Sequence, residues 1–270
     1  MTERSLAPAP PRIGDPRSTA DQVKSLEMET SLHKQLKAIY ADDQQAEIEV
    51  KHGDYRIDVV RDDQLIEIHV ASLSSIRDKI KRLVKTHQVL VVKPIVCRKQ
   101  LVWLDEKQGE VVRRRYSPKR GTLLDAFHEL MYFTQVFPHP NLRLELPLID
   151  IEEWRYRGHG RRRRWRKNDF EIQDRQLVHI HEAPCLHTRD DLRRLADCKL
   201  PQPFHTGDLA KGLKVDRWVA QRIAYCFRKM KVTQQVGKKG NALLYRFANS
   251  PQPRTTRKRR SNGKRRSSSS

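Results

Sequence analysis

Two carboxylates and an imidazole lie inside stretches that otherwise look like buried strands. Asp58 stands in the apolar run 55–60, and Glu67 and His69 stand in the run 64–70. An unpaired charge in such a place is costly, and two converging carboxylates repel each other unless a cation joins them. Oxygen ligands of this kind suit Mg²⁺ or Mn²⁺. These residues therefore predict a site that holds a divalent metal ion.

The elements that would position this site follow from the spacing of apolar residues. An amphipathic helix over 21–40 carries Glu29 near the middle of its apolar stripe. Three short strands separated by turn signals come next, over 47–50, 55–60 and 64–70. A helix and the apolar strand 88–96 follow, which predicts a right-handed crossover with parallel pairing. An α/β sheet of this kind would bring Glu29, Asp58 and Glu67 toward one point.

The order of these residues resembles the PD-(D/E)XK nuclease fold of restriction endonucleases and DNA-repair nucleases. The shared features are an acid on the first helix, "ID" on one strand, "IEIH" on the next, and then a helix and an apolar strand, over about 21–94. The resemblance implies a restriction-endonuclease-like mixed sheet flanked by helices. It also implies that Asp58 and Glu67 are metal ligands and that Ile68 offers a backbone carbonyl. Glu29 would be the acid on the helix.

The sequence departs from this family at two positions. His69 stands where the family has lysine, and Ile57 precedes Asp58 where the family has proline. Some branches of the superfamily take the lysine from the following helix, where this chain has Lys79 and Lys81. Lys79 is the preferred candidate because it lies toward the start of that helix. A neutral imidazole at position 69 could instead accept a proton from a metal-bound water, polarise that water or ligate the metal.

Three interpretations of this group stay open from the sequence. The first is an active metal site, and the second is a decayed site that binds DNA without cutting it. In the third, Asp58 and Glu67 lie on the solvent side of an antiparallel pair of strands and form ion pairs with Arg56 or Lys51.

The charge of the chain indicates its partner. The sequence has 55 Lys and Arg against 33 Asp and Glu, a formal net charge of +22. This excess favours a polyanion, double-stranded DNA above all. An acidic membrane surface is the rival, but we see no apolar run of about 18 residues or more, and we expect no membrane association. The four cysteines form no CxxC pair, so we expect a reduced, cytoplasmic protein, nucleoid-associated if the source is bacterial.

Basic residues gather in three segments. The tail 249–270 has no acidic residue, and it reads as a disordered phosphate-binding tail or a nuclear-localisation signal. The block 155–167 reads as a phosphate-gripping loop or as a solvated charge run. The segment 113–121 precedes a helix start, a good place to hold a phosphate. The residues expected to contact phosphates in the last two segments are Lys119, Arg120, Arg161, Arg162, Arg163 and Arg164.

The C-terminal region 204–247 resembles a winged-helix domain. Its pattern predicts a short helix capped by Thr206, a longer helix capped by Asp216, and a β-hairpin around 237–241. The residues expected on its nucleic-acid surface are Arg217, Gln221, Tyr225 and Arg228 on the longer helix, with Lys238 and Lys239 at the wing tip. A winged helix used for protein contact is the alternative.

A second group of histidines and a cysteine invites a zinc interpretation, which the spacing does not favour. Its members are His179, His181, Cys185 and His187. Two of them alternate along an expected strand, and the spacing matches no standard zinc module. A structural role is the expectation for this group.

The sequence therefore predicts two domains. The expected division is a disordered N-terminus over 1–20, a nuclease-like domain over 21–154, a basic connecting region over 155–200, a winged helix over 201–248 and a disordered basic tail over 249–270. Two functions follow. One is a metal-dependent nuclease that hydrolyses DNA, for which a homodimer would suit cutting of both strands. The other is a non-catalytic DNA-binding or regulatory protein that keeps a nuclease-like core as a scaffold.

Overall fold

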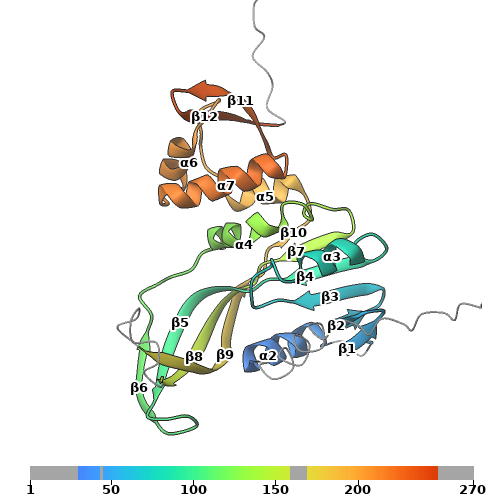
Figure 1. Cartoon of the computed structure of the whole chain (residues 1–270), viewed down its shortest axis with the longest axis vertical. Helices are drawn as coiled ribbons and strands as arrows, with labels where there is room; N and C mark the ends of the chain where they lie inside the picture. The colour runs from blue at the N-terminus through green and yellow to red at the C-terminus, as the bar shows by residue number, and fades with distance from the viewer. Residues whose placement is uncertain (1–29, 43–44, 159–168, 249–270) are drawn as a thin grey trace, which may run out of the picture.

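Two β-sheets with flanking helices and a small C-terminal unit make up the protein. The structure is a computed structural model, and it describes residues 30–42, 45–158 and 169–248. The C-terminal unit of helices and a hairpin stands at one end of the molecule (Figure 1). The mixed α/β class expected from the sequence is confirmed.

The first sheet has six strands and carries the elements predicted around Asp58 and Glu67. In spatial order these are β1 (Glu47–His52), β2 (Tyr55–Arg61), β3 (Gln64–Ile68), β4 (Gln88–Val92), β7 (Leu142–Glu145) and β10 (Cys185–Leu186). Pairing is parallel between β3 and β4 and between β4 and β7, and antiparallel elsewhere. The three predicted strands and the parallel pairing across helix α3 (Arg77–Leu83) are confirmed.

The second sheet has four strands, of which β5, β8 and β9 have ten or more residues. Their order is β6 (Val111–Tyr116), β5 (Ile95–Leu104), β8 (Leu148–Arg157) and β9 (Phe170–Glu182). Strands β5 and β6 form an antiparallel hairpin, and β5 and β8 pair in parallel. The stretch 155–200, expected to connect two domains, instead contributes the end of β8, all of β9 and β10, and helix α5 (Arg189–Leu195). That expectation was wrong because β9 pairs with β8 along nearly its whole length.

The chain passes between the two sheets four times, once through η1 and α4, and each of the other three passages is short and lies at a proline. Pro94 separates β4 from β5, Pro147 separates β7 from β8, and Pro184 separates β9 from β10. Proline has no backbone N–H and interrupts a hydrogen-bonded ladder. The single strand expected over 88–96 is therefore wrong, because it breaks before Ile95.

The three passages are held side by side by backbone hydrogen bonds. The Ile95 N–H donates to the Pro147 carbonyl at 2.8 Å, and the Leu146 N–H donates to the Pro184 carbonyl at 3.0 Å. Lys93, in the first passage, is buried and its Nζ donates to the carbonyls of Val70 at 2.9 Å and Ala71 at 2.5 Å. The division between the sheets is thus a hydrogen-bonded boundary.

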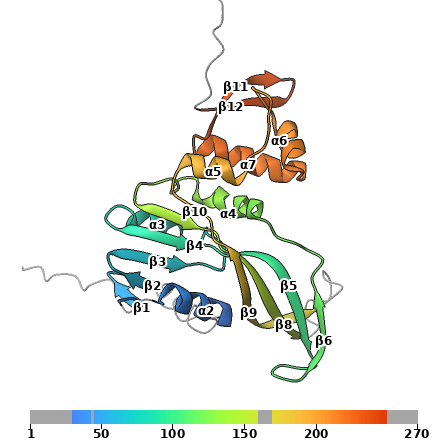
Figure 2. The ribbon, with the colours of Figure 1, turned by 180° about the vertical axis from the view of Figure 1, so that it is seen from behind.

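Helix α2 (Ser31–Tyr40) covers one side of this boundary and contacts both sheets (Figure 2). Its apolar side packs into a core cluster of Leu32, Leu36, Val59, Ile66, Ile68, Leu90, Val92, Ile149 and Ile151. The Ser31 N–H donates to Asp174 Oδ1 on β9 at 2.9 Å. The helix expected over 21–40 is thus confirmed over 31–40. Its first part, with Glu29, lies outside the described residues.

A second core joins the opposite face of the six-stranded sheet to the C-terminal unit. Its helices are α3, α4 (Ala126–Phe133, after the 3₁₀ turn η1, Leu123–Asp125), α6 (Thr206–Leu213) and α7 (Arg217–Lys229). Phe127 on α4 meets Phe227 on α7 edge to face, with ring centroids 5.8 Å apart. The C-terminal unit is therefore packed onto the core through a shared apolar contact.

The C-terminal unit has the predicted order of helix, turn, helix and hairpin. The hairpin pairs β11 (Thr233–Lys239) with β12 (Ala242–Phe247) around Gly240, whose positive φ of 58° suits glycine. The cap of α6 differs from the expected Thr206. His205 is the cap, because its Nδ1 accepts from the Asp208 N–H at 3.0 Å and Asp208 Oδ2 accepts from the His205 N–H at 2.9 Å.

The shared apolar contact leads to a stability prediction. Phe227 is fully buried, so Phe227→Ala should lower the free energy of unfolding by about 3–5 kcal/mol through lost burial and a cavity. Tyr132→Ala, at a 49% exposed side chain on α4, should change it by no more than about 0.5 kcal/mol. Urea unfolding of both variants measures the difference. Equal small losses would contradict a joint core.

Candidate functional site

Asp58 and Glu67 lie on the adjacent strands β2 and β3, as predicted. Glu67 is buried, with 7% of its surface exposed, and the Asp58 side chain is 17% exposed. The Ile68 N–H donates to Asp58 Oδ2 at 2.8 Å, which ties the two strands together at this point. The charge of Asp58 is close enough to raise the pKa of Glu67. The structure thus brings the two predicted carboxylates together.

Lys79 from helix α3 completes this pair. Its Nζ lies 2.6 Å from Glu67 Oε2 and also donates to the Arg56 carbonyl at 2.6 Å. Burial raises the pKa of Glu67 to about 7, against the opposing charge of Lys79 and with the added repulsion of Asp58. Lys81, the other candidate for the lysine of this site, is exposed.

Two basic side chains from α2 face Asp58. His33 Nε2 lies 3.5 Å from Asp58 Oδ2, and Lys37 Nζ lies 3.8 Å from Oδ1. Burial disfavours the charged form of Asp58, but its contacts with His33, the Ile68 amide and Lys37 hold its pKa below the usual value. Sequence reasoning missed both residues. Their signal was the spacing of four, which places them on one side of a helix.

His69 does not take the place beside Glu67 that the resemblance gives to a lysine, because its ring contacts Ser72 and Ser75. Its Nε2 lies 2.9 Å from the Ser72 carbonyl oxygen and 2.8 Å from Ser75 Oγ, in the loop before α3. Burial, together with the charge of Lys93, lowers the pKa of His69 to about 4. The imidazole is therefore neutral at pH 7, and the cation beside Glu67 is Lys79.

The described residues do not by themselves gather the predicted metal ligands. Within residues 30–42, 45–158 and 169–248, three ligand atoms approach within 4.8 Å of one another only at Cys97, Asp150 and His181. Asp58 and Glu67 each pair with protein cations, and Glu29 lies outside these ranges. The solvent-face alternative is wrong, because Glu67 is buried and pairs with Lys79.

The histidines and the cysteine between residues 179 and 187 lie in different surroundings. His181 belongs to the Cys97 and Asp150 cluster on neighbouring strands, whereas His187 Nε2 lies 3.0 Å from the Pro140 carbonyl oxygen. Cys185 is an exposed free thiol on β10.

A groove in the C-terminal unit gathers the residues predicted to contact nucleic acid. Its volume is about 370 Å³, and its lining from α7 is Arg217, Gln221, Tyr225 and Arg228. The opposite wall comes from Asn241, Ala242, Leu243 and Tyr245 of the hairpin, with Thr206 at the start of α6. Lys238 and Lys239 are exposed at the end of β11, beside the hairpin turn. The four helix residues thus share one concave surface.

Three residues beside this groove were missed by sequence reasoning. Trp218, 49% exposed, stacks on the His128 ring with centroids 5.0 Å apart. The Arg222 guanidinium lies 4.9 Å from the Trp218 ring centroid, and its Nη1 is 2.5 Å from His128 Nδ1. The contact between Trp218 and His128 could not be predicted from local patterns, because the two residues come from different helices.

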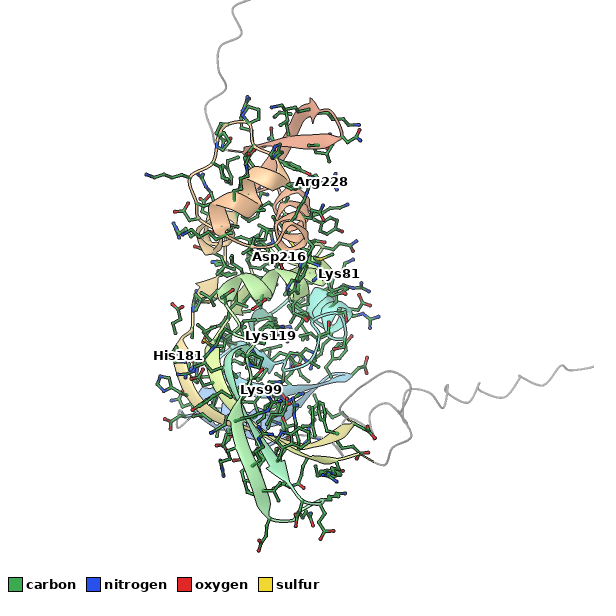
Figure 3. The ribbon with its side chains drawn as sticks, turned by 90° about the vertical axis from the view of Figure 1, so that its left-hand side faces the viewer. Lys81, Lys99, Lys119, His181, Asp216 and Arg228 are labelled. Atoms are coloured by element: carbon green, nitrogen blue, oxygen red, sulfur yellow. The ribbon has the colours of Figure 1, made fainter. Side chains whose placement is uncertain are left out.

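The remaining predicted phosphate contacts lie on the core. Lys119 and Arg120 are exposed before η1, and the charge of Lys119 reaches His128, where it adds to burial and Arg222 in lowering the imidazole pKa. In Figure 3, Arg228 lies on the C-terminal unit and Lys119 lies on the core beneath it. All six residues of β6 are exposed as well. Arg161, Arg162, Arg163 and Arg164 lie outside the described residues.

The buried Glu67 carboxyl gives a pH prediction. Its pKa of about 7 exceeds the usual glutamate value of 4.5, so it should destabilise the folded chain progressively as pH rises between about 4.5 and 7. His69 acts in the opposite direction over about pH 4 to 6.5, so the whole chain mixes both effects. The difference in free energy of unfolding between the wild type and Glu67→Gln isolates the first effect. As pH rises, the wild type should lose free energy of unfolding relative to Glu67→Gln. A difference that does not change with pH would contradict the raised pKa.

Comparison with known proteins identifies the family. Residues 30–187, more than half of the chain, match a family model described as a domain of unknown function, DUF8091. An uncharacterized protein of Treponema pallidum (strain Nichols) is 29% identical over 221 residues, which cover 81% of this chain and 85% of that protein. No solved structure matches. In the described part of the chain, no helix is long and apolar enough to cross a membrane. The chain belongs to the DUF8091 family, whose domain includes Asp58, Glu67 and Lys79.

Proposed function

We propose that this protein binds nucleic acid, most directly duplex DNA, through the groove between α7 and the hairpin of β11 and β12. The observation that carries the proposal is the gathering of Arg217, Gln221, Tyr225 and Arg228 on one concave surface. In this proposal the helix, turn, helix and hairpin act as a winged helix.

The chemistry of the groove suits a duplex. An α-helix fits the major groove of B-DNA, where arginine can bind guanine and glutamine can bind adenine through paired hydrogen bonds. Arg217 and Gln221 are exposed and one helical turn apart, so both can reach base edges. Lys238 and Lys239 at the wing tip can contact phosphates, which fix the register of the protein on the duplex.

Charge supports the same partner. The formal net charge of +22 attracts a polyanion over long range and makes its binding salt-dependent. Beside the groove, Trp218 and Arg222 extend the surface toward the core, where Lys119 is exposed. A protein partner for this surface would have to be acidic, and it is an outcome that the binding test separates.

Arginine substitutions test this proposal. Arg217→Ala and Arg228→Ala should each weaken duplex binding by about 1–3 kcal/mol, and the loss of a phosphate contact should reduce the log–log salt slope by about 0.9. Fluorescence anisotropy with a labelled duplex at several salt concentrations measures both quantities. Arg194→Ala is the control, since this side chain is 76% exposed on α5, away from the groove. Equal losses in all three variants, or a flat salt dependence, would contradict the proposal.

A second candidate function is hydrolysis of the phosphodiester at Asp58, Glu67 and Lys79. The observation that favours it is the pairing of Lys79 with Glu67, since a lysine from this helix is what the PD-(D/E)XK resemblance requires when position 69 is not lysine. The carboxylates of Asp58 and Glu67, on adjacent strands, are oxygen ligands that fit Mg²⁺ or Mn²⁺. Such an ion would supply Lewis-acid polarisation of the phosphate and a more acidic bound water.

The residues of this chain would divide the work of such a site. Asp58 and Glu67 would hold the ion, and Lys79 would orient the attacking water from its place beside Glu67. Burial raises the pKa of Glu67 to about 7, and a bound cation would favour the ionised form that ligates it. The non-catalytic alternative rests on the same contacts, because the pairing of each carboxylate with protein cations is by itself sufficient to keep the group buried.

Substitutions of Lys79 and Asp58 separate the catalytic from the non-catalytic alternative. If the site is catalytic, Lys79→Ala and Asp58→Asn should each slow metal-dependent nicking of supercoiled DNA at least about 100-fold, because they remove a group that acts in the reaction. Lys81→Ala, at an exposed position on the same helix, should leave the rate unchanged. Circular dichroism checks the fold of each variant, and anisotropy checks that DNA affinity persists. Binding without nicking in Mg²⁺, Mn²⁺ or EDTA would establish the non-catalytic alternative.

A further inference from the structure

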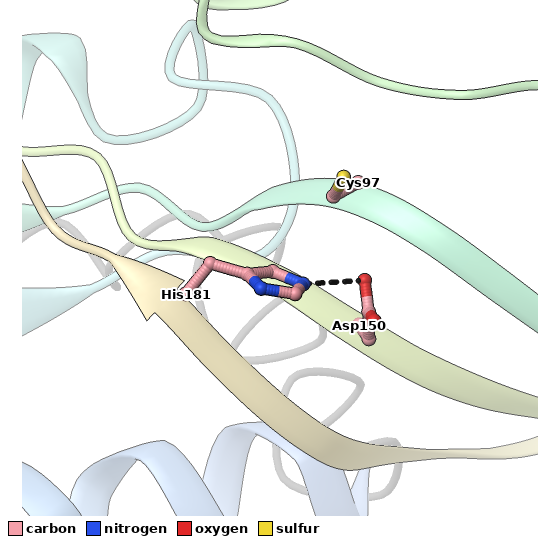
Figure 4. Close-up of side chains that lie close together, drawn as sticks. All are labelled: Cys97, Asp150 and His181. Atoms are coloured by element: carbon pink, nitrogen blue, oxygen red, sulfur yellow. Dashed lines mark ion pairs between the residues drawn. The ribbon is translucent and has the colours of Figure 1, made fainter.

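Three residues with different donor atoms meet on the four-stranded sheet, away from the groove and from Glu67. Cys97 lies on β5, Asp150 on β8 and His181 on β9, three adjacent strands. One ligand atom from each lies within 4.8 Å of the other two. Figure 4 shows the His181 ring with its Nε2 turned toward Asp150.

Their meeting follows from the boundary between the sheets. Cys97 lies three residues after Pro94, Asp150 lies three residues after Pro147, and His181 lies three residues before Pro184. The three passages run side by side, so these residues come close together, although the direct ladder partners of Asp150 are Arg98 and His179.

Two β-bulges adjust the outer members of this group. The ladder between β5 and β8 shifts between Val96 and Arg98, so Cys97 is the extra residue. The ladder between β8 and β9 shifts near its start, where Ile149 faces Ile180 and Leu148 faces Glu182, so His181 is the extra residue. Bulges re-aim side chains and are frequent beside functional sites.

The Asp150 carboxylate provides a second, independent observation. Its Oδ1 is buried and makes no hydrogen bond to the described residues, although His181 Nε2 lies only 3.0 Å away. A buried acceptor left without a partner is costly, so such an atom calls for an explanation. The Asp150 oxygen and the His181 nitrogen are close but not aligned for a hydrogen bond with each other. Two such atoms are suited to binding one metal ion between them.

We propose that Cys97, Asp150 and His181 form a binding site for a divalent transition-metal ion of the zinc type. Thiolate sulfur, imidazole nitrogen and carboxylate oxygen are the three ligand types that Zn²⁺ takes in proteins. Three protein ligands leave a fourth position for water or a substrate group. The His179 ring, with its centroid 4.6 Å from that of His181, is the nearest candidate to fill that position instead. The sulfur ligand disfavours Mg²⁺ and Ca²⁺.

A nucleophilic triad of the same residue types fits the geometry less well. Such a triad needs one imidazole nitrogen on the cysteine and the other on the carboxylate. In Figure 4 the Nδ1 of His181 lies on the backbone side of the ring, away from Cys97. The edge that faces Asp150 is also the edge nearer the cysteine, which is the arrangement of ligands around one ion.

Cobalt titration tests the site, because Co²⁺ takes zinc positions and its bond to a thiolate has its own charge-transfer absorption in the near ultraviolet. The full chain, prepared without a histidine tag and stripped with a chelator, is titrated with Co²⁺ and then with Zn²⁺. One equivalent should produce the thiolate band, and Zn²⁺ should abolish it. Cys97→Ser should remove the band, whereas Cys185→Ser, at the exposed thiol on β10, should keep it.

Ligand variants make the test specific. Loss of a neighbour that only orients a ligand costs about 10- to 100-fold in affinity, so His181→Ala and Asp150→Asn should weaken Zn²⁺ binding by more than about 100-fold. Circular dichroism confirms the fold of each variant, and Zn²⁺ should raise the melting temperature of the wild type and of Cys185→Ser but not of the three ligand variants. A thiolate band that persists in Cys97→Ser, or the absence of stoichiometric binding by the folded wild type, would overturn the proposal.

Discussion

The missing backbone N–H of three prolines is the constraint on which this structure depends. Pro94, Pro147 and Pro184 each remove one backbone donor at the points where three neighbouring passages of the chain leave one sheet for the other. Both candidate centres lie close to this boundary. On one side, the His69 N–H donates to the Val92 carbonyl at 2.9 Å, which fixes the end of β3 beside the end of β4. On the other side, strand pairing and two β-bulges near the prolines bring a thiol, a carboxylate and an imidazole close together.

Buried carboxylates behave differently on the two sheets, and the number of cations around each explains why. The Glu153 side chain, 1% exposed on β8, contacts Lys99, Arg155 and Arg175. Burial opposes its charge, yet these three cations lower its pKa to about 2, so it is a fixed structural anion. Glu67 has one lysine and a second carboxylate nearby, and burial raises its pKa to about 7. A carboxyl that can change its proton near neutral pH is the kind found at functional sites, which is why the Glu67 pair remains the candidate for chemistry.

Sequence patterns predicted the elements well where the period of apolar residues is regular. Alternation and helical spacing gave β1 to β4, α3 and the order of the C-terminal unit, and proximity to the helix start favoured Lys79 over Lys81. The break at Pro94 was visible in the sequence, but the apolar run on both sides of it outweighed the missing donor. Only the end of β9, around His179 and His181, was expected as a strand, because the thirteen residues of β9, "FEIQDRQLVHIHE", are largely polar and only partly buried. The Cys97 cluster could not be predicted, because its members meet through strand pairing and bulge positions that no local pattern contains.

The shared apolar core fixes the C-terminal groove relative to the rest of the molecule, so a duplex bound there would take a defined position. The central claim is that this groove is the surface that holds nucleic acid. The most direct measurement is photocrosslinking of the full chain to a duplex that carries bromodeoxyuridine, with the crosslinked peptides identified by mass spectrometry. If the groove holds nucleic acid, the crosslinks will lie in α7 and in the hairpin of β11 and β12, and they will be lost at high salt. Crosslinks confined to the two sheets, or a folded chain that forms no complex with the duplex, would contradict it.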